Sequence, residues 1–288
     1  TRRISSAASD VYKRQGCDPW DRFANILVKN SDTNQWYEMA RHITPYGVGN
    51  SQLTRGLEVD VTDFKSLLSG NVELKIYAET WVASGWVISL EFDYLAGNPD
   101  YKYYQITPVI QFNRNSLSGV PYGGENGNTQ LDKEKFDLTK TISVGSNIKS
   151  AHFRTIISGW GHATPADSDG RACAEWCFRT HKIKINNVDK FSHYMGPIGC
   201  GNNPISNQGG NWAPDRAGWC PGMVVPLRLD KFDTDVSNTD INFEYYFQPW
   251  TNNFVGTPGY NNKNAYNAIS TFIVLKSDQE IEPATISN

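Results

Sequence analysis

The sequence predicts an all-β protein of antiparallel sheets, arranged as sandwiches or jelly rolls. Two segments, Val72 to Ala78 and Ile241 to Phe247, alternate apolar and polar residues with a period of two, which is typical of strands with one buried face. Turn residues punctuate the chain, most densely from 197 to 222. Because the helical signal is confined to one short segment, many short strands joined by long loops are expected.

The elements follow in chain order from the same patterns. One helical turn is expected at 62–68, where Thr62 is a suitable N-cap. The polar segment 113–148, rich in Gly and Asn, is expected to be a surface excursion without chemistry. Strands are expected at 25–29, 72–78, 87–94, 104–112, 153–157, 181–186, 241–247 and 269–276.

The domain organisation is predicted from a shift in composition and from one linker. The sequence GNPD at 97–100 separates two clusters of strands, which predicts an N-terminal domain over 16–99 and a C-terminal domain over 101–288. Residues 1–15 are rich in Ser, Ala and Arg and lack periodicity. We expect them to be a non-native segment and exclude them from the fold prediction.

Composition excludes several classes of function. The 288 residues carry a net charge of −3, so there is no basic field to attract nucleic acid. Apolar runs are far shorter than the roughly 18 residues of a membrane span, and the first fifteen residues lack the apolar region of a signal peptide. The nine Trp residues are mostly expected in the core, although exposed ones often line sugar or peptide grooves.

The five cysteines are informative because four of them form local pairs. Cys173 and Cys177 lie four apart, while Cys200 and Cys220 enclose a loop rich in Gly, Asn and Pro. Two pairs and the single Cys17 predict disulfides and an oxidising compartment, with the partner of Cys17 lost by truncation. A zinc site is the alternative, but the Cys-x-x-Cys spacing of common zinc motifs is absent.

Three carboxylates share an unusual neighbour. Asp21 lies in CDPWDR, Glu79 in YAETW and Glu175 in CAEWC, so each acid is next to a Trp. A carboxylate beside an indole is partly desolvated, which suits acid–base chemistry. The alternative for each is a surface acid or a partner of an arginine.

Arg216 is the candidate cation. It lies in NWAPDRAGWCPG, between Trp212 and Trp219, where a guanidinium can hold a carboxylate in fixed geometry. The alternative is a structural ion pair with Asp215. The five histidines form neither adjacent pairs nor His-x-His, so no metal cluster is predicted. No nucleophile elbow, P-loop or dinucleotide fingerprint is present, which leaves carboxylate chemistry on water.

Several long motifs carry a family resemblance. They are CDPWDRFANILVKN, RGLEVDVTDFKSLLSGNVELKIYAETW, ISGWGHA, CAEWCFRTHKIKINN and NWAPDRAGWCPGMVVP. They resemble the motifs of the peptide:N-glycosidase F family, and the similarity runs from about Cys17 through FQPWTNN to the terminal strand AISTFIVLK.

The resemblance implies a fold and a reaction. The fold is two antiparallel jelly-roll domains packed side by side, the first truncated at its N-terminus, with an active-site cleft at their junction. The reaction is hydrolysis of the asparagine side-chain amide to the chitobiose core of an N-glycan, which leaves aspartate and releases a glycosylamine. No cofactor or metal is implied. The expected partners are N-glycosylated proteins and glycopeptides, for a monomeric, bacterial, secreted or periplasmic enzyme.

The resemblance also assigns roles to residues. Asp21 matches the primary catalytic aspartate, Glu175 and Glu79 match the other two acids of the cleft, and Arg216 matches a supporting arginine. The Cys173–Cys177 and Cys200–Cys220 pairs match two family disulfides, and Cys17 is expected to remain a thiol. The residues expected in or near the sugar-binding cleft are Trp20, Arg22, Trp81, Trp160, Trp176 and Trp219.

Two departures and three alternatives accompany this interpretation. Compared with the family, the opening stretch of the first domain is missing, and the excursion near 123–142 looks longer. The alternatives are a non-catalytic glycan-binding jelly roll, a glycosidase that cuts within the chitobiose core, and a copper monooxygenase. The missing His-x-His disfavours the last of these.

Overall fold

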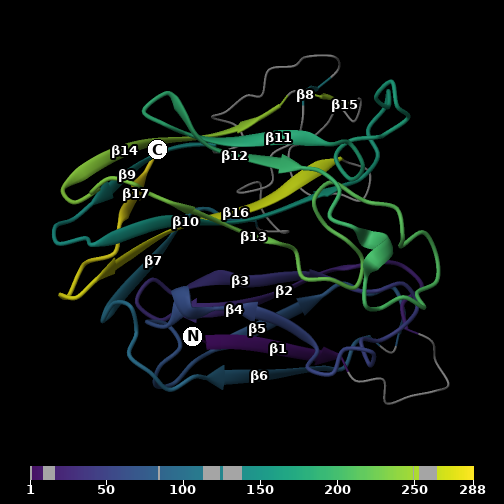
Figure 1. Cartoon of the computed structure of the whole chain (residues 1–288), viewed down its shortest axis with the longest axis horizontal. Coiled ribbons are helices and arrows are strands. Elements are labelled where there is room, and N and C mark those ends of the chain that lie inside the picture. The colour runs from purple at the N-terminus through teal and green to yellow at the C-terminus, as the bar shows by residue number, and fades with distance from the viewer. Residues whose placement is uncertain are drawn as a thin grey trace. The chain divides into compact units, whose positions relative to one another are not determined.

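The computed structural model describes residues 2–8, 17–83, 85–112, 124–125, 138–248, 250–252 and 265–288. These residues confirm the predicted all-β class, because they form antiparallel sheets with two single-turn 3₁₀ helices (Figure 1). The chain divides into two compact units. Unit 1 comprises Thr1–Asp100, Ile198–Asp215 and Trp219–Val225, and unit 2 comprises Tyr101–Pro197, Arg216–Gly218 and Pro226–Asn288.

Unit 1 contains two three-stranded sheets that face each other. A small cavity between them is lined by His42, Leu57, Ala78 and Ile88, which come from strands of both sheets. One sheet has the order β4-β1-β6 and the other β3-β2-β5. The strands are β1 Arg2–Ala8, β2 Phe23–Asn30, β3 Gln35–Ile43, β4 Leu57–Asp60, β5 Leu74–Ala78 and β6 Ile88–Tyr94.

Unit 2 contains a four-stranded and a five-stranded sheet whose inner faces meet. Phe153 of one sheet contacts Phe243 of the other, with ring centroids 5.4 Å apart, and Phe191 at 6.2 Å. The orders are β13-β10-β16-β7 and β12-β11-β14-β9-β17. The strands are β7 Tyr103–Ile110, β9 Thr139–Val144, β10 Ser150–Trp160, β11 Arg179–Ile185, β12 Val188–Met195, β13 Leu227–Lys231, β14 Thr239–Phe247, β16 Tyr266–Ser277 and β17 Thr285–Ser287; β8 Gly124–Glu125 and β15 Thr251–Asn252 form a short parallel pair.

The eight predicted strands coincide with β2, β5, β6, β7, β10, β11, β14 and β16. The expected burial of β5 is wrong, since Leu74 and Ile76 are 36% and 37% exposed. This strand is at the edge of its sheet. The jelly-roll connectivity of both domains stays a prediction.

Three further expectations need correction. The turn at 62–68 is a 3₁₀ helix over Thr62–Phe64 whose N-cap is Val61, and the Thr62 N–H donates to Asp60 instead. The end of the supposed excursion 113–148 is strand β9, in which Ile142 is fully buried; its positions 113–123 and 126–137 lie outside the described residues. The exclusion of residues 1–15 from the fold is corrected too, because Arg2–Ala8 form β1, the middle strand of a sheet. That the segment is non-native stays a prediction.

Most of the loop between 198 and 225, namely Ile198–Asp215 and Trp219–Val225, belongs to unit 1, although the predicted boundary placed it in the C-terminal domain. Its backbone pairs with the end of β3 and the residues that follow. Ile43 N–H donates to Met223 O at 3.1 Å, Gly222 N–H to Ile43 O at 2.9 Å, and Gly209 N–H to Tyr46 O at 3.0 Å. The Cys200–Cys220 disulfide closes this loop. These contacts hold in one conformation a segment whose regular structure is a single 3₁₀ turn, η2 Cys200–Asn202.

Within the described ranges, no helix has the length and apolar character to cross a bilayer.

Candidate active site

The segment CDPWDR is organised by Asp18, an acid that sequence reasoning missed. Arg22 donates from Nε to Asp18 Oδ2 at 2.9 Å and from Nη2 to Oδ1 at 3.1 Å. The backbone N–H groups of Trp81 and Trp20 donate to the same carboxylate at 2.8 Å and 3.1 Å. A carboxylate has about four acceptor sites, so these four donors occupy Asp18, whose side chain has no exposed surface.

The charge of Asp18 is stabilised by these donors. Burial alone would raise its pKa, but the hydrogen bonds from Arg22, Trp81 and Trp20 outweigh that effect and hold the pKa below its usual value of 3.8. Asp18 therefore stays ionised and acts as a fixed anchor for the residues on both sides of it.

Arg22, held by Asp18, in turn positions the side chain of Trp81. Its guanidinium carbon lies 3.7 Å from the centroid of the Trp81 ring, a cation–π geometry. Arg22 is buried, whereas Trp81 is 68% exposed and Trp20 is 55% exposed. Two broad indole faces are thus held at the surface of unit 1, as a sugar-stacking role requires.

Asp21 and Glu79 lie at the same end of the β2–β5 pair. Asp21 comes just before β2, and Glu79 comes just after β5. The register pairs Ala24 with Ala78, and Glu79 N–H donates to Phe23 O at 3.0 Å. The Glu79 carbonyl accepts from Trp86 Nε1 at 2.9 Å. The fold thus brings these two predicted acids together, and both are partly exposed.

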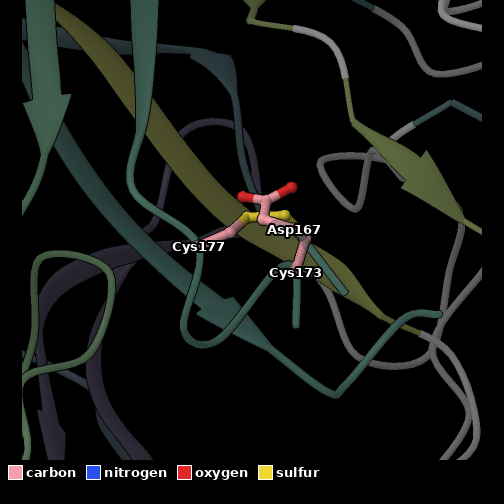
Figure 2. A group of neighbouring side chains, drawn as sticks. All are labelled: Asp167, Cys173 and Cys177. Carbon is pink, nitrogen blue, oxygen red and sulfur yellow. A yellow bond between two sulfur atoms is a disulfide. The ribbon is translucent and has the colours of Figure 1, made fainter. Parts of the chain in front are cut away.

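In unit 2, the loop CAEWC is closed by the predicted Cys173–Cys177 disulfide, with Asp167 beside it (Figure 2). The loop lies on a buried apolar cluster that includes Ala163, Trp250 and Ala265. Ala163 N–H donates to Cys173 O at 2.5 Å, and Ala217 N–H donates to the carbonyl of Glu175 at 2.8 Å. These contacts fix the backbone direction of Glu175.

Gly159 explains how the loop can lie so close to β10. A Cβ atom at this position would collide with the carbonyl oxygen of Ala174. Because only glycine lacks that atom, the close approach that seats the loop depends on Gly159.

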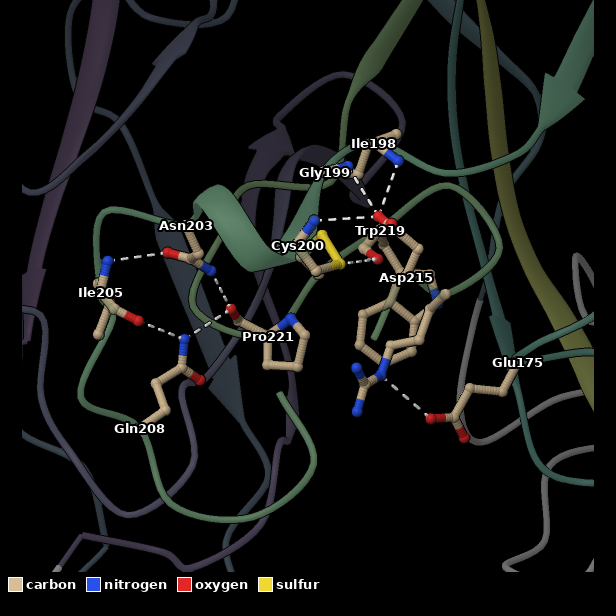
Figure 3. The surroundings of a disulfide bond; sticks show 12 residues. Glu175, Ile198, Gly199, Cys200, Asn203, Ile205, Gln208, Asp215, Trp219 and Pro221 are labelled. Carbon is tan, nitrogen blue, oxygen red and sulfur yellow. Dashed lines mark hydrogen bonds and ion pairs between the residues drawn. A yellow bond between two sulfur atoms is a disulfide. The ribbon is translucent and has the colours of Figure 1, made fainter. Parts of the chain in front are cut away.

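The Glu175 carboxylate is held from two directions. Arg216 Nε donates to Oε1 at 3.3 Å (Figure 3), and Oε2 lies 3.0 Å from His162 Nε2. Arg216 is fully buried, and its guanidinium carbon lies 4.5 Å from the centroid of the Trp176 ring. Three predicted site residues, Glu175, Arg216 and Trp176, are therefore in contact, together with His162, which was not predicted.

Asp215, the alternative partner of Arg216, has a structural role. Its Oδ1 accepts N–H groups from Ile198, Gly199 and Cys200 at 3.1, 2.7 and 3.0 Å. The arrangement stabilises the start of the disulfide loop in unit 1 (Figure 3).

Two predicted sugar-binding residues, Trp219 and Trp160, are wholly or partly buried. Trp219 has no exposed surface, so stacking on a sugar would require it to move. Trp160 is partly buried and donates from Nε1 to Ser158 Oγ at 3.1 Å. That Asp21, Glu79 and Glu175 line one cleft stays a prediction.

Among the residues that the structure describes, two groups of neighbouring side chains have the spacing of metal ligands: Asp167 with Cys173 and Cys177, and Asp215 with Cys200 and Cys220. In both groups the sulfur atoms are bonded to each other, so they are not the thiolates that zinc binds. Asp167 pairs with Arg179 through two contacts of 2.8 and 2.7 Å.

Comparison with known proteins decides the family. Two family models match, described as Peptide-N-glycosidase F, N terminal, over residues 17–94, and Peptide-N-glycosidase F, C terminal, over 126–274. The chain belongs to the peptide-N-glycosidase F family. The peptide-N(4)-(N-acetyl-β-D-glucosaminyl)asparagine amidase F of Elizabethkingia miricola is 54% identical over 273 residues, which cover 94% of this chain and 73% of that protein.

Solved structures also resemble the chain. The chain matches the PNGase F of Flavobacterium meningosepticum, described as a glycosylasparaginase, with a TM-score of 0.88 and 51% identity, covering 100% of this chain and 88% of that one. PNGF-II matches with a TM-score of 0.65 and 14% identity over 97% of this chain and 56% of its own, which indicates a shared fold alone.

The sequence contained signals for Asp18 and His162, the two site residues that were not predicted. Asp18 and Arg22 lie four apart in CDPWDR, and His162 lies in the quoted motif ISGWGHA. The sequence could not show which of the two acids of CDPWDR is buried, because this depends on the backbone N–H groups that donate to Asp18.

Proposed function

We propose that this protein is an amidase that hydrolyses the asparagine side-chain amide of N-linked glycans. Water adds to the amide carbonyl, the C–N bond breaks, and the products are aspartate on the peptide and a glycosylamine that later loses ammonia. The observation that carries the proposal is 54% identity over 273 residues to a relative named as an asparagine amidase.

The proposed roles follow the environment of each residue. Asp21 is partly exposed and acts on the attacking water, since a carboxylate can position or deprotonate it. Glu175, with Arg216 behind it, orients and polarises the reacting amide. Glu79 binds sugar or adjusts Asp21. The exposed Trp20 and Trp81 supply stacking faces for the glycan.

The proposed substrates are N-glycosylated proteins and glycopeptides, bound by a monomer without a cofactor. We propose that the enzyme is secreted or periplasmic, and the support for this is its two disulfides, which persist in oxidising compartments.

The test is mass spectrometry of a denatured N-glycoprotein after incubation in ¹⁸O-labelled water, with Asp21→Asn as the matched control. The expected product is a deglycosylated peptide in which asparagine has become ¹⁸O-labelled aspartate. A peptide that keeps a single sugar on asparagine would identify a glycosidase instead. Retention of the glycoprotein on an affinity column without any product would identify a binding protein.

A further inference from the structure

His162 has two competing partners at a single ring nitrogen. Trp176 Nε1–H points at His162 Nε2 from 2.8 Å, and Glu175 Oε2 lies 3.0 Å from that same atom. The first contact requires Nε2 to accept a hydrogen bond. The second, to an ionised carboxylate, requires Nε2 to carry a proton and donate it.

The two contacts cannot both be hydrogen bonds at one moment. In the neutral imidazole whose proton is on Nδ1, the Nε2 atom offers one lone pair, which the indole N–H can use. When that lone pair holds a proton, the nitrogen becomes a donor that suits Glu175 and no longer accepts from Trp176. Protonation of one atom therefore exchanges one hydrogen bond for the other.

We infer that His162 is a positioning residue whose protonation state selects between Trp176 and Glu175. The inference deepens the proposed amidase function and rests on it for its consequence in catalysis. A proton from water binds Nε2, the imidazolium N–H engages Glu175 Oε2, and the indole N–H of Trp176 is released. Loss of the proton to water reverses both changes.

The surroundings favour such an exchange. The His162 side chain is 61% exposed, so it reaches solvent protons, whereas the Glu175 side chain is 13% exposed. Arg216, which is permanently charged and fully buried, contacts the other carboxylate oxygen and the Trp176 ring. Glu175 is the charged group that faces the imidazole in these contacts, and Arg216 stands behind it.

The consequence is a pH-dependent position for Glu175. At low pH both of its oxygens are engaged, by Arg216 and by the imidazolium. At higher pH His162 turns to Trp176, and Oε2 becomes available to the reacting amide. The amidase rate is therefore expected to fall on the acid side as His162 becomes protonated.

The experiment follows the His162 ring by ¹H–¹⁵N NMR titration in the whole chain, in parallel with the pH–rate profile. Trp176→Phe removes the donor that stabilises the neutral ring, so the titration midpoint should rise by roughly half to one pH unit. Glu175→Gln removes the carboxylate that stabilises the charged ring, so the midpoint should fall. Opposite shifts are the expected signature.

The activity measurement uses His162→Gln, whose amide fills a similar space but does not titrate. Its pH–rate profile should lose the step of the acid limb whose midpoint coincides with the NMR midpoint of His162, while any step from protonation of Asp21 remains. Unchanged midpoints in Trp176→Phe and Glu175→Gln, or a rate step at the NMR midpoint of His162 that survives in His162→Gln, would overturn the inference. The NMR arms do not need turnover, so they separate this outcome from failure of the amidase proposal. If Glu175→Gln does not fold, the midpoint of Trp176→Phe alone decides.

Discussion

Each unit contains a buried arginine paired with a carboxylate, and the two pairs differ in how many acceptor sites of the carboxylate are occupied by donors. In unit 1, Asp18 meets Arg22 through two hydrogen bonds and accepts two backbone N–H groups as well. In unit 2, Glu175 meets Arg216 through one contact of 3.3 Å, and its second oxygen faces the exposed His162.

The difference separates an anchor from a reactive group. An acid whose acceptor sites are filled by rigid donors has nothing left for a substrate, so Asp18 determines the positions of Arg22 and Trp81 and takes no part in bond making. An acid with one oxygen on a permanent cation and the other on a titratable ring can change partners. Glu175 belongs to this second kind, and the predictions below are designed to break or sharpen the contrast.

The largest effect is expected for Asp21→Asn, which removes the proposed base beside the anchor. Loss of a positioned base typically lowers the rate by about 10²–10⁴-fold, while glycan binding should change little. Single-turnover kinetics and binding of a glycopeptide measure the two effects separately. Equal losses in rate and affinity would make Asp21 a sugar ligand instead.

The anchor itself is tested by Asp18→Asn, which keeps the shape but leaves Arg22 buried without its counter-charge. Breaking a buried ion pair in this way costs about 3–5 kcal/mol of unfolding free energy. Denaturant unfolding at neutral pH measures that cost.

The same variant should also respond differently to acid. The pKa of Asp18 is lower in the folded state than its usual 3.8, so its contribution is complete above that value and is lost as pH falls through the folded pKa. The wild type should therefore lose stability more steeply below pH 3.8 than Asp18→Asn. Parallel acid curves would show that Asp18 is not the anchor described above.

The two disulfides extend the comparison to the backbone. Cys200–Cys220 encloses a long loop in unit 1, with a sequence separation of 20, and Cys173–Cys177 has a separation of 4. Loop entropy predicts about 3 kcal/mol for the longer bridge and less for the shorter one. Cys200→Ser/Cys220→Ser should lower the melting temperature more, and Cys173→Ser/Cys177→Ser should mainly lower activity. Early melting with full activity in the short-loop variant would contradict this division.

The smallest effect is expected from chelators. The proposed chemistry uses carboxylates, and in the described part of the chain the two groups with metal-ligand spacing each contain a disulfide. Activity after treatment with EDTA should match the untreated enzyme. A loss of activity that zinc or copper restores would contradict the proposed metal-free mechanism.

The sequence predicted those parts of the fold in which burial follows a simple alternation. It predicted β14 because polar and apolar residues alternate there, and it failed on β3, where the charged Glu38 and Arg41 have no exposed side-chain surface. These two form an ion pair of 2.7 Å inside the core, so charge was a misleading guide to exposure.

Strand β12 was missed for the opposite reason, because most of its residues are exposed and its apolar signal is weak. The site shows a similar limit. Motifs identified Asp21, Glu175 and Arg216 by residue type, but the partners of Asp18 and His162 depend on hydrogen-bond geometry. Residues distant in sequence, such as Trp81, supply those partners.

The return of most residues between 198 and 225 to unit 1 has a consequence for synthesis of the protein. During translation the chain emerges from its N-terminus, and domains generally fold as they become complete. Unit 1 needs the partners of Ile43 and Tyr46, which are Gly209, Gly222 and Met223. Unit 1 begins to emerge from the ribosome first, but it is complete only when nearly four-fifths of the chain has been made. A gene fragment that ends after Asp100 would lack the residues that pair with Ile43 and Tyr46.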